Sequence, residues 1–141
     1  MNLNTRISEI MEQDLITVDI SDSLKEVMAI FNEIKIRHIP VLTGSSLIGM
    51  ISHTDVLKVD EVNKIIINKV SVANRNIPEI ELRKVMAQNP VTIEQDKTIL
   101  DAAEVFAKNQ FHALPVTSEG DLVGIITTTD IMKFIIGQTL I

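Results

Sequence analysis

The chain has 141 residues, of which 45% are hydrophobic and 23% are charged, and its formal net charge is −6. This composition is typical of a folded globular protein, and the acidic charge with only four phenylalanines as aromatics argues against nucleic-acid binding. The lack of cysteine excludes disulfides, thiolate metal sites and cysteine nucleophiles. Apolar runs are too short to span a membrane and no secretory signal is visible, so we expect a soluble cytoplasmic protein.

From residue 15 onwards, the pattern predicts a strand, a helix, two further strands and a second helix. Leu15–Val18 is a short apolar strand, and the apolar residues that follow it recur at helical spacing. The next strand ends at Pro40–Val41, and after a turn the strand Leu47–Ile51 leads directly to a helix that begins near Asp55. The apolar stripe of the first helix consists of Leu24, Val27, Met28, Phe31 and Ile34.

Residues 58–84 join this unit to a second one and are too apolar for a flexible linker. We expect the preceding helix to continue to about Lys69 and a turn to follow around residues 74–76. A short helix should then run from Pro78 toward Ala87, because proline suits the first turn of a helix. The earlier order of elements follows again: strand Val91–Ile93, a helix carrying Ile99, Ala102, Ala103 and Phe106, strands ending at Val116 and Ile126, and a helix near Asp130.

An internal repeat organises the chain. A shift of 75 residues, the separation of Asp55 from Asp130, aligns residues 10–57 with 85–132 without a gap. One β-α-β-β-α unit of about 50 residues is too small to bury its own sheet and helices well, so we expect two units to pack together. The predicted fold is α/β (α+β), with units at 1–69 and 70–141. Identical pairs include Met11 and Met86, Thr17 and Thr92, Phe31 and Phe106, Pro40 and Pro115, and Gly49 and Gly124.

A hydroxyl residue stands three positions before an acidic residue at the start of both predicted helices of each repeat, at Ser23, Ser52, Thr98 and Thr127. Such capping boxes satisfy the free amides of a first helical turn, and capping alone explains these residue types. The boxes at Ser52 and Thr127 differ from the others because each follows a strand and its glycine without a loop, which favours phosphate at the helix N-terminus. A carboxylate there could accept two hydrogen bonds from a ribose diol. Both roles are compatible if the carboxylate turns from the cap to the ligand.

Several features recur in the same order at this one offset: Met11 with Thr17 and Met86 with Thr92, Arg37-His38-Ile39-Pro40-Val41 and His112-Ala113-Leu114-Pro115-Val116, and two G-x-x-[S/T]-x-x-D stretches. Together they make the duplicated unit resemble the CBS domain pair, or Bateman module, over nearly the whole chain. The resemblance implies two units related by a pseudo-two-fold axis, with an adenosine nucleotide or a related adenosyl compound bound as a regulatory ligand in the clefts between them. It also implies that no cofactor is required.

The resemblance also implies roles for individual residues. Asp55 and Asp130 would bind ribose, and Arg37 and His38 would add positive charge near the phosphate in the first unit. The second unit has His112 followed by an uncharged alanine, so we expect the first unit to dominate for AMP-like ligands. Phosphate would be bound by Ser52 and Thr54 in the first unit and by Thr127 and Thr129 in the second, and His53 is a further candidate cation.

Adenine needs an apolar slot, which the first strands could supply through residues 16–18 and 91–93. By the family arrangement, Thr17 would complete the cleft that holds Asp130, and Thr92 the cleft that holds Asp55. Without the resemblance, both threonines would be explained by strand propensity. Arg37 would then be a solvated surface arginine.

Two other classes of protein compete with a ligand sensor. An enzyme is disfavoured because the sequence has no G-x-S-x-G, P-loop or H-E-x-x-H motif, and His53 with Asp55 lacks further ligands for a metal. We therefore assign no catalytic or metal-binding residue. A structural or dimerisation module with empty clefts, acting on an unidentified effector protein, remains open. The apolar residues of Ile131–Ile136 exceed one helix face and predict a homodimer in either case.

Overall fold

The computed structural model describes residues 2–59 and 79–139, which belong to two compact units. Ile16–Asn89 forms one, called here the central unit. Met1–Leu15 and Pro90–Ile141 together form the other, called the terminal unit because it contains both ends of the chain. This division differs from the boundaries 1–69 and 70–141 predicted from the repeat, because the first 15 residues pack with the second repeat.

The central unit is built on a four-stranded sheet with the strand order β1-β2-β3-β4. Strands β1 and β2 are parallel, and the other pairs are antiparallel, with Ile39 opposite Ile51 and Val41 opposite Gly49. Residues 53–59 are helical and directly follow β3. The other elements are β1 (Val18–Asp19), α1 (Leu24–Glu33), β2 (His38–Thr43), β3 (Ser46–Ser52), the 3-10 helix η3 (Leu82–Lys84) and β4 (Ala87–Gln88).

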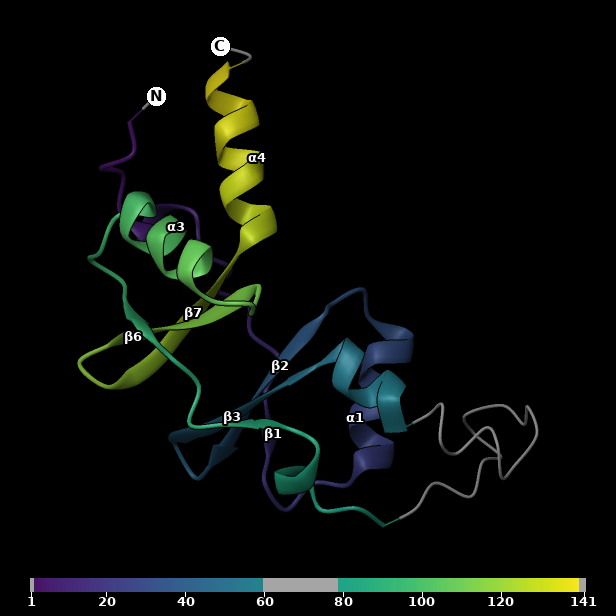
Figure 1. Cartoon of the computed structure of the whole chain (residues 1–141). Helices are drawn as coiled ribbons and strands as arrows, with labels where there is room; N and C mark the ends of the chain where they lie inside the picture. The colour runs from purple at the N-terminus through teal and green to yellow at the C-terminus, as the bar shows by residue number, and fades with distance from the viewer. Residues whose placement is uncertain (1, 60–78, 140–141) are drawn as a thin grey trace. The chain divides into compact units, whose positions relative to one another are not determined.

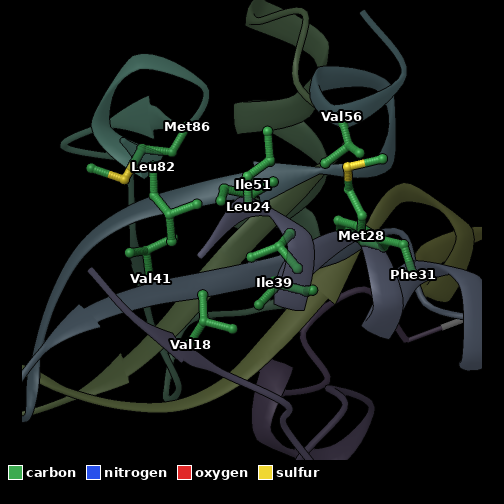
Figure 2. Close-up of a cluster of buried hydrophobic side chains, with 11 residues drawn as sticks. Val18, Leu24, Met28, Phe31, Ile39, Val41, Ile51, Val56, Leu82 and Met86 are labelled. Atoms are coloured by element: carbon green, nitrogen blue, oxygen red, sulfur yellow. The ribbon is translucent and has the colours of Figure 1, made fainter. Parts of the chain in front are cut away.

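The core of the central unit lies between α1 and the sheet (Figure 2). Four of the five predicted stripe residues are buried there, as helical spacing requires. The exception is Ile34, which is the C-cap of α1 with extended backbone angles and is 41% exposed, so its side chain leaves the stripe. Leu82 and Met86, which lie just before and at the start of the second repeat, complete the core of the central unit.

The terminal unit has a three-stranded sheet with the order β5-β6-β7, in which β5 is parallel to β6 and β7 is antiparallel to it. The N-terminal segment belongs to this unit and lies beside α3 (Figure 1). Ile7 is fully buried in its core, and the Ile7 amide donates to the Lys97 carbonyl at 2.8 Å. The elements are η1 (Ile7–Glu9), β5 (Ile93–Glu94), α3 (Ile99–Lys108), β6 (Ala113–Ser118), β7 (Asp121–Thr127) and α4 (Thr128–Thr139).

These elements confirm the α/β (α+β) class and the tandem β-α-β-β-α units, whereas the pseudo-two-fold axis stays a prediction. Three expected elements differ. Both first strands are only two residues long and begin later, at Val18 and Ile93, because only these residues pair with β2 and β6. The helix expected up to Ala87 is instead η3 followed by β4, because pairing with β3 overrides local helix propensity there.

The start of that predicted helix at Pro78, the continuation to Lys69 and the turn at 74–76 lie outside the described residues. Within residues 2–59 and 79–139, no helix is long and apolar enough to cross a bilayer.

Candidate functional site

In the central unit, the start of β2, the end of β3 and the start of a helix meet at one corner, called here the Asp55 corner. His38 begins β2 and is paired with Ser52, the last residue of β3. The His53 amide, at the start of the helix, donates to the Arg37 carbonyl at 2.8 Å. Strand pairing therefore brings Arg37 and His38 next to the Ser52–Asp55 box, although 15 residues separate Arg37 from Ser52 in the sequence.

The terminal unit repeats this arrangement at its Asp130 corner. Ala113, the first residue of β6, is paired with Thr127, the last residue of β7, and the Thr128 amide donates to the His112 carbonyl at 3.0 Å. These two amide–carbonyl bonds were not foreseen from the sequence. They help to hold each helix N-terminus beside the residue that precedes, or begins, the neighbouring strand.

The predicted helix caps are present at both corners. The Ser52 amide donates to Asp55 Oδ2 at 2.9 Å, and the Asp55 amide donates to Ser52 Oγ at 3.0 Å. The corresponding distances in the Thr127–Asp130 box are 2.9 and 3.1 Å. The box before α3 has the same two bonds, while before α1 only the bond from the Glu26 amide to the Ser23 hydroxyl is formed, at 3.1 Å. Capping therefore explains part of the sequence pattern at every box and does not by itself mark a ligand site.

Both corner carboxylates retain acceptor capacity after capping. Each cap uses Oδ2, and within the described residues Oδ1 of Asp55 and of Asp130 accepts no hydrogen bond. Both side chains are half-buried, whereas Thr54 and Thr129 beside them are exposed. A carboxylate can accept about four hydrogen bonds in total, so a ligand hydroxyl could bind without displacing the cap. The sequence analysis had assumed that the carboxylate must turn from the cap to reach a ligand. With Oδ2 in the cap, Oδ1 can accept a ligand hydroxyl without that rotation.

The charged groups of the two corners differ. Arg37 is exposed and His38 is half-buried at the Asp55 corner, whereas the Asp130 corner has an exposed His112 and a buried Ala113 in the same places. His53 was a further candidate cation, and its ring packs edge-on against Phe31 of α1, with the ring centroids 5.5 Å apart and the planes at 70°. Its role toward phosphate stays a prediction.

Thr17 and Thr92 are both exposed, and each directly precedes a strand residue that belongs to its unit's core. Because side chains alternate between the two faces of a strand, burying Val18 and Ile93 turns the threonines outward. Val18 and Ile93 belong to the two cores, and the adenine slot expected at residues 16–18 and 91–93 stays a prediction. Val91, which is 51% exposed, remains accessible.

The structure thus groups nine of the eleven predicted site residues at two corners, and Thr17 lies in the central unit while Thr92 lies in the terminal unit. The pairing of these threonines with the corner of the other unit stays a prediction. Among the described residues, no group of three or more His, Asp or Glu could hold a metal ion. The Asp55 corner holds Arg37, His38, Ser52, Thr54 and Asp55, and the Asp130 corner holds His112, Thr127, Thr129 and Asp130.

Sequence comparison identifies relatives along almost the full chain. The family model of the CBS domain matches twice, at residues 7–61 and 82–137. The uncharacterized protein MJ1426 of Methanocaldococcus jannaschii is 28% identical, with 96% of each chain covered. The uncharacterized protein MJ1232 of the same organism is also 28% identical, and an inosine-5'-monophosphate dehydrogenase of Korarchaeum cryptofilum is 26% identical. The chain spans only 41% and 23% of the length of these last two relatives.

Solved structures of similar fold include two with bound adenosyl compounds. CBSX2 of Arabidopsis thaliana, in complex with AMP, has a TM-score of 0.77 at 22% identity, covering 96% of this chain and 98% of that one. The CBS domain pair of protein MJ0100, in complex with 5'-methylthioadenosine and S-adenosyl-L-methionine, has a TM-score of 0.74 at 24% identity, covering 95% and 98%. At these identities, the likeness establishes the fold.

Proposed function

The chain belongs to the CBS domain family, and on that premise we propose that it is a regulatory, non-catalytic module that binds an adenosine nucleotide or a related adenosyl ligand between its two units. The observation that carries this proposal is the Asp55 corner. There, a carboxylate whose Oδ1 accepts no hydrogen bond from residues 2–59 or 79–139, an exposed hydroxyl and an arginine are grouped at the start of a helix. These are the groups that a ribose and a phosphate require.

The ligand chemistry is suggested by the relatives of similar fold. AMP is bound to CBSX2, and 5'-methylthioadenosine and S-adenosyl-L-methionine are bound to MJ0100, so adenosine is common to all three compounds. Only AMP carries a phosphate. A site with Arg37 and His38 beside a helix N-terminus favours the phosphorylated member of this set, because the arginine is permanently charged and the helix dipole adds partial positive charge.

Within this proposal, the two corners have different preferences. We place AMP-like ligands at the Asp55 corner, with Asp55 on the ribose, Ser52 and Thr54 on the phosphate, and Thr92 completing the site. The Asp130 corner would be completed by Thr17 and would bind the ribose through Asp130. It has less positive charge, because His112 and Ala113 stand where the Asp55 corner has Arg37 and His38, so it suits adenosyl ligands without phosphate. The proposal includes a cytoplasmic location, where such ligands are available, and a protein effector that responds to them.

Homodimerisation through the helices that follow Asp55 and Asp130 is part of the proposal. Met132 and Ile136 of α4 are 62% and 57% exposed, which is unfavourable for apolar side chains in a monomer unless another surface covers them. The same observation supports the alternative function, a structural module that dimerises with empty clefts and acts on a partner protein.

A thermal-shift panel of AMP, ADP, ATP and S-adenosylmethionine separates the two functions. A ligand that binds only the native state stabilises it by about 2.7 kcal/mol at a concentration 100 times its Kd. We expect the melting temperature to rise with at least one of the four compounds and to rise further as its concentration increases. If none of them shifts the melting temperature at millimolar concentration, the structural module is the better reading.

A further inference from the structure

The chain enters α1 and α3 in the same way. Residues 20–25, called here the α1 start, and residues 95–100, called the α3 start, each leave a short first strand and begin a helix. The Ile20 and Gln95 amides donate to carbonyls of β2 and β6 at 2.8 and 2.9 Å. Each helix then begins after a hydroxyl residue whose side chain accepts an amide of the first turn. The two starts therefore have the same backbone groups in the same places.

In the terminal unit, the N-terminal segment covers the α3 start. Arg6 and Thr98 face each other as an antiparallel bridge. On one side of the bridge is the bond from the Ile7 amide, described above, and on the other the Ile99 amide donates to the Thr5 carbonyl at 2.9 Å. The amide that follows Ile99 also donates to this segment, at 3.1 Å. The segment thus provides acceptors for two amides of the first turn that have no partner within the helix.

Residues 79–89 are the counterpart of the N-terminal segment in the central unit, because the 75-residue shift relates them to residues 4–14. The helix η3 takes the place of η1, and each begins with a residue that is at most 1% exposed. Met86 packs over Gly49 as Met11 packs over Gly124, so that a Cβ atom on either glycine would collide with a methionine sulfur. The two segments therefore occupy equivalent places within their own units.

The α1 start, however, is not covered. Within residues 2–59 and 79–139, no backbone hydrogen bond joins residues 79–83 to the α1 start, and the Leu24 and Lys25 amides donate to no acceptor. A pocket of about 780 Å³ lies there instead. Its lining consists of residues 20–25 with Glu79, Ile80, Glu81 and Arg83. The segment that could cover the α1 start thus forms the other wall of the pocket.

We propose that residues 79–81 are a strap that closes this pocket by pairing with the α1 start, in the register that the N-terminal segment has on the α3 start. In the closed form, Glu81 lies opposite Ser23 and the Leu24 amide donates to the Ile80 carbonyl. Closure gives acceptors to amides at the positive end of the α1 dipole, at the cost of ordering three residues. Because these opposing effects are of similar size, the open and closed forms can interconvert. This inference concerns the central unit alone and does not depend on the proposed function.

Disulfide trapping in the full-length protein tests the closed form, since the chain has no cysteine of its own. The test pair is Ser23→Cys with Glu81→Cys, and the reference pair is Arg6→Cys with Thr98→Cys, where the bridge is present. Opposite residues of such a bridge have Cβ atoms about 4.5–5.5 Å apart, within a small shift of disulfide geometry. The control pair is Ser21→Cys with Glu81→Cys, because Ser21 lines the same pocket but is two residues out of register.

Under mild oxidation, we expect the test pair to form its disulfide within about tenfold of the rate of the reference pair and at least about tenfold faster than the control pair. Oxidation of the test pair should also slow hydrogen exchange of the Leu24 amide at least about tenfold relative to the reduced form, because closure gives this amide an acceptor. Cross-linking of the test pair no faster than that of the control pair would overturn the inference. A disulfide that leaves Leu24 exchange unchanged would overturn it as well.

The test and reference pairs both remove a capping hydroxyl, so the melting temperatures of the reduced proteins are measured first. If loss of Ser23 unfolds the protein, Leu24 exchange in the wild type is compared with that in a variant carrying Glu79→Gly, Ile80→Gly and Glu81→Gly. Three glycines raise the entropy lost on closure, so Leu24 should exchange at least about twofold faster in this variant. Equal exchange rates would contradict the strap.

Discussion

Replacing Asp55 with asparagine separates the capping role of this carboxylate from its proposed ligand role. Asp55 Oδ2 accepts the Ser52 amide at 2.9 Å, and the amide oxygen of asparagine can accept the same bond. The variant loses the negative charge in the first helical turn, which contributes about 0.3–1 kcal/mol to the free energy of unfolding. It also loses a charge-assisted hydrogen bond to a ribose hydroxyl, which should weaken binding by about 1.5–3 kcal/mol, or roughly ten- to a hundredfold.

The control for this variant is Asp101→Asn. Asp101 forms the same box with Thr98, with distances of 2.9 and 3.1 Å, but it lies in the first turn of α3, where we propose no ligand. Calorimetry with AMP should show a large loss of affinity for Asp55→Asn, a smaller one for Asp130→Asn and none for Asp101→Asn, while all three lower the melting temperature slightly. If AMP affinity is unchanged in both Asp55→Asn and Asp130→Asn and the melting temperature falls, these aspartates are helix caps only.

Three further predictions concern packing, assembly and pH. In urea unfolding, Gly124→Ala should destabilise the protein by about 1–3 kcal/mol, because the added Cβ meets the Met11 sulfur at 2.6 Å. Gly137→Ala in α4 should instead stabilise it by up to about 1 kcal/mol, because no atom lies within 4 Å of the added Cβ and alanine favours a helix over glycine. Light scattering should give twice the 15.7 kDa chain mass for the wild type and the monomer mass for Met132→Lys; a wild-type monomer at micromolar concentration would contradict the dimer. Hydrogen bonds from the Thr98 amide and hydroxyl hold the pKa of Asp101 below its ordinary 3.8, so this carboxylate stabilises the fold above pH 3.8 and loses that effect as the pH falls through its lowered pKa. The difference in melting temperature between the wild type and Asp101→Asn should therefore shrink below pH 3.8, and a constant difference would contradict this cause.

The sequence by itself determined the features that depend on neighbours along the chain. The stripe from Leu24 to Phe31 is buried because residues three and four apart share a helix face. The caps at Ser52 and Thr127 form because each hydroxyl and carboxylate reaches amides only three residues away. The repeat, and with it the tandem β-α-β-β-α units, could likewise be read directly from the identical residues at a fixed spacing.

Only the tertiary structure decided the features that need a distant partner. Ile7 and Met11 pack in the unit of the second repeat, and residues 82–89 complete the unit of the first, because each segment finds its buried surface and strand partner there. The same cause made β1 and β5 shorter than expected, since a strand extends only as far as its neighbour pairs with it. The sequence showed that Met11 and Met86 occupy equivalent positions of the repeat. It did not show that each methionine packs over a strand glycine, because 37 residues separate Met86 from Gly49 and local pattern does not fix contacts over that distance.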